Sequence, residues 1–263
     1  TISEGHIACT PDQLESEFAG CVELANYILK TLGLNEDVWY RFSKWDENNK
    51  EKYIGSAEEW EMVQNRMRGI LDDLNIDYTE ADGEAAFYGP KLDVQIKNVH
   101  GKEDTLVTVQ VDFQLAKRFE MSYIDADGQS KYPYVIHRTS LGCYERTLAL
   151  LIEKYAGALP TWLMPEQVRI LPISDRLQEN ALKVEKLLKD HGIRVTTDTR
   201  SEKVGYKIRE AQLEKIPYMV IIGDKEVESG TISVRGRKDG DIGSMTVEDF
   251  TNKILDEITS KSI

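Results

Sequence analysis

The segment from Thr105 to Phe113 alternates strictly between apolar and polar side chains. One side carries Val107, Val109, Val111 and Phe113, and the other carries Thr108, Gln110 and Asp112. A period of two is typical of a strand that has one face on a core and the other face open. A second alternating segment, Leu92 to Ile96, precedes it across the turn at His100 and Gly101, which favours antiparallel pairing. We therefore expect an antiparallel sheet with one polar face that looks into a pocket.

The stretch from Pro133 to Ala156 is predicted to run from a strand into a helix. Pro133 to His137 has strand character, and the apolar residues that follow recur at helical spacing: Leu141, Leu148, Leu151 and Tyr155. Gly142 and Arg146 would then share one helix face. The glycine suggests a close approach to the backbone, and the arginine could stack on a base or bind a phosphate. Spacing alone leaves open helix packing and a salt bridge instead.

Two helices are predicted before that point. Neither carries a chemical signature, so we expect both to support the fold. The first begins at Thr10 and Pro11, an N-cap and a first helical position, and ends at Gly33. Its apolar stripe comprises Phe18, Val22, Ala25 and Leu29. The second begins with the capping box of Ser56 and Glu59, and its inward residues are Trp60, Val63, Met67, Ile70 and Leu74. Residues 38–42 between them are expected to form a strand.

A proline-bounded segment, Leu159 to Pro165, separates this pattern from a different one. Strands are predicted at residues 168–173, 194–198, 218–222 and 231–235, and helices at 177–191, 204–215 and 247–260. Alternating strands and helices predict an α/β domain with a mixed sheet. We expect residues 1–160 to form an α+β domain, 161–165 a hinge and 166–263 the α/β domain.

Charge and composition limit the classes of function. The net charge of −13 argues against nonspecific nucleic-acid binding, but it is uneven, with −12 before Glu166 and −1 from there onward. The second part could therefore bind a polyanion. Three cysteines without framework spacing favour a reducing cytoplasm, and no apolar run approaches the roughly 20 residues of a membrane span.

Several strings resemble the threonyl-tRNA synthetase family of class II aminoacyl-tRNA synthetases. Gly142-Cys143-Tyr144-Glu145-Arg146, after Ile136-His137-Arg138, is similar to the third signature motif of that class. The string Ala86-Phe87-Tyr88-Gly89-Pro90-Lys91 is similar to a pocket segment of the family. Residues 198–210 and 216–226 resemble the anticodon-binding domain shared by threonyl, prolyl, histidyl and glycyl synthetases. The resemblance covers essentially the whole chain and implies a class II catalytic portion followed by an anticodon-binding domain.

The resemblance implies a function and a set of site residues. The parent enzyme would activate threonine with ATP and Mg²⁺ and pass the threonyl group to tRNA(Thr), working as a cytoplasmic homodimer with no membrane partner. The implied catalytic residues are Tyr88, Lys91, Gln110 and Arg146, and the implied substrate or ATP contacts are Glu4, Asp112, Gly142, Cys143 and Arg146. The implied anticodon contacts are Ser201, Lys207, Arg209, Glu226 and Arg235.

The family also holds an active-site zinc ion with two histidines and one cysteine. His6 and His137 match the histidines, whereas the matching cysteine would lie before Thr1. An open zinc position can bind the amino group and hydroxyl of threonine and so reject valine. Cys9 stands three residues after His6 and would point to the opposite face of a strand. We therefore expect weak or absent zinc binding by this chain.

The opening residues lack an initiator methionine, and the first class II motif and most of the second are missing. We expect a C-terminal portion of a longer protein with little or no aminoacylation activity of its own. Two departures from the family pattern, Ile2 for a glutamine and Glu4 for an aspartate, affect substrate contacts. Two alternatives stay open: a non-catalytic tRNA-binding paralogue, or a class II synthetase for proline or glycine.

Overall fold

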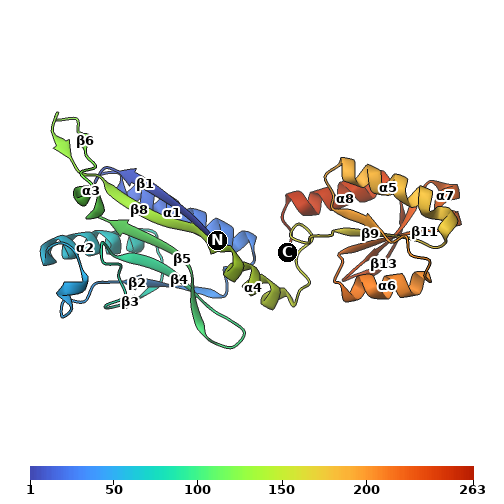
Figure 1. The fold of residues 1–263 in the computed structure, drawn as a ribbon, viewed down its shortest axis with the longest axis horizontal. Coiled ribbons are helices and arrows are strands. Elements are labelled where there is room, and N and C mark those ends of the chain that lie inside the picture. Colours follow the sequence, from blue (N-terminus) through green and yellow to red (C-terminus); the bar gives the residue numbers. More distant parts are fainter. The chain divides into compact units, whose positions relative to one another are not determined.

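A computed structural model describes residues 1–263 apart from the side chain of Lys50. The chain divides into two compact units, Thr1–Glu153 and Lys154–Ile263, whose elements are labelled in Figure 1. Across the described residues, no helix combines the length and apolar character that crossing a membrane requires.

The first unit is built on a six-stranded sheet with the order β1-β8-β5-β4-β2-β3. The strands are β1 (Ile2–Cys9), β2 (Val38–Ser43), β3 (Tyr78–Ala81), β4 (Lys91–Lys97), β5 (Glu103–Asp112) and β8 (Tyr134–Cys143). All neighbours pair antiparallel except β2 with β3. The antiparallel sheet predicted from the alternating segments is therefore confirmed. A small hairpin of β6 (Tyr123–Ile124) and β7 (Ser130–Lys131) stands apart from this sheet.

Helices α1 (Leu14–Thr31) and α2 (Ala57–Asp73) share one apolar core with the sheet. Phe18 and Trp60 are fully buried there, together with Val109 and Val111 of β5. The capping box of Ser56 and Glu59 opens α2 as predicted. Helix α1 begins later than predicted, because Thr10 and Pro11 form a turn in which Thr10 accepts from the Gln13 backbone. One face of the sheet is thus occupied by core, and the polar face is left for a site.

The stretch from Pro133 to Ala156 folds differently from the prediction. Strand β8 continues to Cys143, and helix α4 (Tyr144–Tyr155) begins only afterwards. Gly142 therefore lies at a strand end with φ of 68°, and not on a helix face with Arg146. A Cβ atom on Gly142 would lie 1.9 Å from the carbonyl oxygen of Leu106. The close approach inferred from this glycine is real, but the group that approaches is the backbone of β5.

Several short elements complete the first unit: the 3₁₀ turn η1 (Lys50–Lys52) and the four-residue helix α3 (Leu115–Arg118). In α4 the buried residues are Thr147, Leu150 and Leu151, whereas Leu148 is 51% exposed. The predicted apolar stripe through Leu141 and Leu148 is wrong. Leu141 belongs to strand β8, before the helix begins, and Leu148 lies on the exposed side of the helix.

The second unit is an α/β sandwich around the sheet β10-β9-β11-β12-β13. Its strands are β9 (Val168–Pro172), β10 (Val195–Thr197), β11 (Tyr218–Ile222), β12 (Ile232–Gly236) and β13 (Gly240–Met245). Strands β10, β9 and β11 run parallel and β12 and β13 antiparallel, so the predicted mixed sheet is confirmed. The sequence did not predict β13.

Helices cover both faces of that sheet. The 3₁₀ turn η2 (Asp175–Leu177) leads into α5 (Gln178–Asp190), which shares one core with α8 (Val247–Thr259), and α6 (Val204–Leu213) packs on the other face, as Figure 1 shows. The additional helix α7 (Asp224–Ser229) was not predicted. Coverage on both faces explains why β11 is apolar throughout instead of alternating, and why β9 is apolar apart from Arg169.

The segment predicted as a hinge is fixed to the second unit. Arg194 donates to the carbonyls of Trp162 and Met164, and Arg237 donates to those of Ala158 and Leu159. The side chain of Thr161 donates to Glu257 at 2.6 Å. The division between the units falls after Glu153, so residues 161–165 belong to the second unit and do not form a separate linker.

Candidate functional site

The predicted site residues of the first unit share one face of its sheet because of the strand register. His6 pairs with His137, His137 with Gln110, Gln110 with Lys91, and Lys91 with Ser43. Directly paired residues point to the same side of a sheet. Five strands therefore contribute to one row of polar side chains, and this row runs along the face opposite α1 and α2.

A cleft of about 270 Å³ opens on this face, and we call it the central cleft. Its lining includes six predicted or neighbouring polar residues: Glu4, Thr108, Gln110, His137, Cys143 and Arg146. The ring of His6 lies beside it, with its centroid 4.7 Å from that of His137. Residues far apart in sequence, His6, His137 and Arg146, therefore converge at one place, as the sequence hypothesis required.

The loop before β4 brings Tyr88 over the row. Gly89 allows this, because a Cβ atom there would lie 1.7 Å from the carbonyl oxygen of Val111. The Tyr88 hydroxyl donates to Gln110 Oε1, and its ring centroid lies 5.1 Å from that of His137. Burial raises the pKa of Tyr88, and the carboxylates of Asp112 and Glu4 act in the same direction. The phenol therefore stays protonated and can donate a hydrogen bond.

Asp112 is completely buried and holds His137 in place. One carboxylate oxygen accepts from the backbone N–H groups of Gln114 and Leu115, at 2.9 and 2.8 Å. The other lies 3.0 Å from His137 Nε2. Because a carboxylate only accepts, Nε2 is the donor in this contact, and in the neutral imidazole the lone pair then lies on Nδ1. Asp112 is therefore placed behind the histidine and does not line the central cleft.

Lys91 is held by a second buried carboxylate, Asp93. The ammonium lies 2.9 and 3.2 Å from the two oxygens of Asp93, which is completely buried. Ser43 and Thr108 also donate to Asp93, at 2.7 and 2.9 Å. The Lys91 ammonium is thus fixed beside Gln110.

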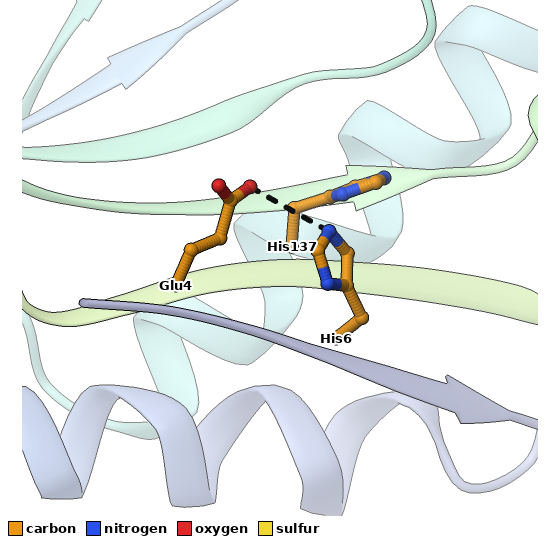
Figure 2. A group of neighbouring side chains, drawn as sticks. All are labelled: Glu4, His6 and His137. Carbon is orange, nitrogen blue, oxygen red and sulfur yellow. Dashed lines mark ion pairs between the residues drawn. The ribbon is translucent and has the colours of Figure 1, made fainter. Parts of the chain in front are cut away.

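Glu4, His6 and His137 form a cluster that could hold a metal ion. One ligand atom from each residue lies within 4.8 Å of the others, and Figure 2 shows the three side chains together. His6 Nε2 is 3.5 Å from Glu4 Oε1. Imidazole and carboxylate are ordinary zinc ligands, so the residues present fit the zinc ion that the resemblance implies.

Gly142, Cys143 and Arg146 line the far part of the central cleft. Arg146 is exposed, and one guanidinium nitrogen donates to the Thr105 carbonyl at 2.5 Å. Its remaining N–H groups can face a ligand in the cleft. Cys143 Sγ lies 3.1 Å from Glu145.

The predicted anticodon contacts differ in exposure. Ser201 and Arg209 are exposed, and Glu226 accepts from the Gly223 backbone at 2.9 Å as it caps α7. Arg235 has a buried Nε that finds no hydrogen-bond partner among the described residues. Lys207 is only 2% exposed, and its ammonium donates to the carbonyls of Pro172 and Asp198. This burial removes Lys207 from direct contact with a base.

The sequence did not single out Asp93, Thr139 or Ser43. Asp93 could have been found, because it follows Lys91 by two residues and so shares its strand face. Ser43 and Thr139 carry no such signal, since only the pairing of β2 with β4 and of β8 with β5 brings them to the row.

The fold and the site together define a class of protein. Residues 1–155 match the family model of the tRNA synthetase class II core domain (G, H, P, S and T). Residues 167–257 match the model of the anticodon binding domain. The chain therefore belongs to the class II tRNA synthetases.

Individual relatives narrow the comparison to threonine-tRNA ligases. The chain is 59% identical to threonine-tRNA ligase of Clostridium perfringens over 261 residues, which is 99% of the chain and 41% of the relative. It is 45% identical to that of Oceanobacillus iheyensis, again over 41% of the relative. The crystal structure of the RNA binding domain of threonyl-tRNA synthetase from Cryptosporidium parvum superimposes with a TM-score of 0.89 at 31% identity, covering 97% of this chain and 63% of that one.

Proposed function

We propose that the chain is part of an enzyme that attaches threonine to tRNA(Thr) through a threonyl-adenylate. The observation that carries the proposal is the convergence of His6, His137, Gln110 and Arg146 on the central cleft in a class II core. The chain spans 41% of the length of its curated relatives, so the activity is proposed for the longer protein. Its homodimeric state and cytoplasmic location are part of the same proposal.

The residues in the polar row and beside it divide into two groups by chemistry. Arg146 and Lys91 supply positive charge, so we assign to them the phosphates and adenine of ATP, which binds with Mg²⁺. Arg146 lines the central cleft with Gly142 and Cys143. Tyr88 and Gln110 are joined by a hydrogen bond and offer donors and acceptors for the amino acid. Catalysis would then depend on positioning and charge stabilisation.

Recognition of threonine is assigned to the histidine side of the cleft. A zinc ion bound there would accept the amino group and hydroxyl of threonine, which valine cannot match. Asp112 supports this role by fixing the orientation and tautomer of His137. Gln110 is the register partner of His137 and lies beside it in the polar row.

The second unit is proposed to read the anticodon. Ser201, Arg209, Glu226 and Arg235 offer the polar groups that contact the edges of unstacked bases. Lys207 is reassigned to a structural role, since its ammonium is buried against two backbone carbonyls. The match of residues 167–257 to the family model of the anticodon binding domain supports this assignment.

Amino-acid-dependent exchange of pyrophosphate into ATP tests the proposal in the full-length protein. Threonine is expected to support exchange, and Arg146→Ala is expected to lower it by about 100-fold or more, as for other groups that stabilise transition-state charge. Arg118→Ala is the matched control, because Arg118 is exposed at the end of α3. Exchange with proline or glycine would support a synthetase for another amino acid, and exchange with none would support a non-catalytic tRNA-binding protein.

A further inference from the structure

We infer that Arg41 and Trp39 on β2 contact the single-stranded 3′ end of the tRNA, on the part of the sheet face that lies beyond the central cleft. This inference rests on the proposed function and adds to it a place that holds the second substrate. Neither residue belongs to the strings that resemble the synthetase family. Their position follows from β2, β4 and β5, which are successive neighbours in the sheet (Figure 1).

Arg41 lies on the same sheet face as the central cleft. Its register partner on β4 is Asp93, and the register partner of Asp93 on β5 is Thr108, which lines the cleft. Directly paired residues share one face, and neighbouring strands are about 4.8 Å apart. Arg41 is therefore two strands, or about 10 Å, from the cleft wall. Trp39 is two residues before Arg41 on β2 and shares its face.

The guanidinium of Arg41 has donors without acceptors. Its only ion pair among the described residues is with Asp93, at 3.6 Å. That carboxylate already accepts from three other side chains, those of Lys91, Ser43 and Thr108. The Nε atom of Arg41 is buried and has no hydrogen-bond partner among the described residues, although the side chain as a whole is 26% exposed. A buried N–H without an acceptor is unfavourable, and a guanidinium matches the geometry of phosphate. Turning the guanidinium toward a phosphodiester group would supply the missing acceptor.

The neighbouring side chains favour a nucleic acid over a small anion. Trp39 is half-buried, and the Lys97 ammonium on β4 lies 5.7 Å from its ring centroid. An aromatic ring beside cations is the combination with which proteins bind single-stranded nucleic acid, because bases stack on the ring and the cations contact the backbone. The basic residues on this part of the face outnumber the acidic ones, although the chain before Glu166 has a net charge of −12. The basic residues are Arg41, Lys91 and Lys97, and the acidic ones are Asp93 and Glu103, the register partner of Lys97.

The 3′ end of the tRNA is the proposed substrate that meets these requirements. Its terminal ribose would accept the threonyl group at the central cleft, so the nucleotides before it must cross the surrounding sheet face. Threonine carries no phosphate, and the phosphates of ATP are assigned to Arg146 and Lys91. Arg41 and Trp39 are therefore left for the backbone and a base of the single strand next to the terminal nucleotide.

Steady-state aminoacylation by the full-length protein tests this inference. Arg41→Gln is expected to raise the KM for tRNA(Thr) by about tenfold, as for loss of a hydrogen bond to a charged group. Threonine-dependent pyrophosphate exchange needs no tRNA and is expected to keep its KM for ATP. Arg41→Lys retains the charge and should lose less than Arg41→Gln does. Trp39→Leu removes the ring and should weaken tRNA binding by about fivefold or more.

Filter binding of tRNA(Thr) at several salt concentrations separates a phosphate contact from a structural effect. Each phosphate contact contributes about 0.7–0.9 to the slope of log affinity against log salt concentration, and Arg41→Gln should reduce the slope by this amount. A loss of folded protein would lower the amount bound without changing the slope. Arg66→Gln is the matched control, because Arg66 is similarly exposed, at 30%, but pairs with Glu15 on the helix side of the sheet. It should leave the KM and the slope unchanged, and circular dichroism establishes that each variant is folded.

An unchanged KM for tRNA(Thr) and an unchanged salt slope in Arg41→Gln would overturn the inference. A raised KM for ATP in the exchange reaction, with tRNA binding unaffected, would also contradict it, because Arg41 would then contact ATP. Absence of threonine-dependent exchange by the unaltered full-length protein would count against the proposed function instead, so the two failures are distinguishable.

Discussion

The two units place polar side chains in opposite ways. In the first unit, strand register lines them up on an open sheet face, where buried carboxylates hold Lys91 and His137. In the second unit, both faces of the sheet are covered by helices, and the exposed candidates Ser201 and Arg209 lie in the segment before α6 and on α6 itself. The proposed pocket for small substrates therefore lies on an open sheet face, and the proposed surface for a large polyanion lies on helices and loops.

Buried charged side chains also have different roles in the two units. In the first unit the buried carboxylates position groups of the site. In the second unit the buried ammonium of Lys207 on α6 donates to the backbone carbonyls of Pro172 on β9 and of Asp198 in the loop after β10, and so joins these elements to one another. We therefore expect substitutions of buried charges in the first unit to affect stability and site chemistry together, and those in the second unit to affect stability alone.

The largest effect is expected for Asp93→Asn. This change leaves the Lys91 ammonium and the neighbouring Arg41 guanidinium without their buried counter-charge, and breaking such a pair costs about 3–5 kcal/mol of unfolding free energy. Urea denaturation measures it. Asp82→Asn is the control: Asp82 pairs with Lys44 but its side chain is 76% exposed, so a loss below about 1 kcal/mol is expected. Equal effects of the two changes would show that the polar row is not held by buried charge.

Helix α6 contains a buried and an exposed basic residue, Lys207 and Arg209, only two positions apart, so their substitutions can be compared directly. Lys207→Met leaves two buried carbonyls without their donor and should lower the unfolding free energy by about 2 kcal/mol. Arg209→Ala should change it by less than about 0.5 kcal/mol while weakening binding of tRNA(Thr) by about 1–3 kcal/mol. Denaturation and filter binding measure the two effects. Weaker tRNA binding by a fully folded Lys207→Met variant would contradict the assignment of Lys207 to structure.

The smallest effect concerns acid stability in the second unit. Hydrogen bonds from the Arg200 guanidinium hold the pKa of Asp198 below its usual value. Because the folded-state pKa is lowered, the contribution of Asp198 is complete above the unfolded value of about 3.9 and is lost as pH falls through the folded value. Asp198→Asn should therefore lower stability by about 1–2 kcal/mol at neutral pH and converge with the unchanged protein in acid.

Denaturation at several pH values measures this convergence. Asp190→Asn, an exposed aspartate at the end of α5, is expected to follow the unchanged protein throughout. A constant difference between Asp198→Asn and the unchanged protein down to acid pH would contradict the role of the Arg200 pair.

Local patterns predicted much of the fold because they depend on nearest neighbours. The alternation of β5 and the capping box of α2 both describe groups a few residues apart, and both predictions are confirmed. The strand-to-helix boundary near Gly142 was placed too early, because a glycine at a crowded strand end and one in a helix look alike in sequence. Contact with the Leu106 carbonyl decides between them.

The sequence by itself determined the two-part organisation, the polar alternation of β5 and the motif residues at His6, Tyr88, Lys91, His137 and Arg146. Only the tertiary structure decided which side chains stand behind them, because Asp93, Asp112 and Lys207 gain their roles from burial and from partners on other elements. It also brought Glu4 to the two histidines. Periodicity fixes the face on which a residue lies, whereas register and packing fix which residues meet it there.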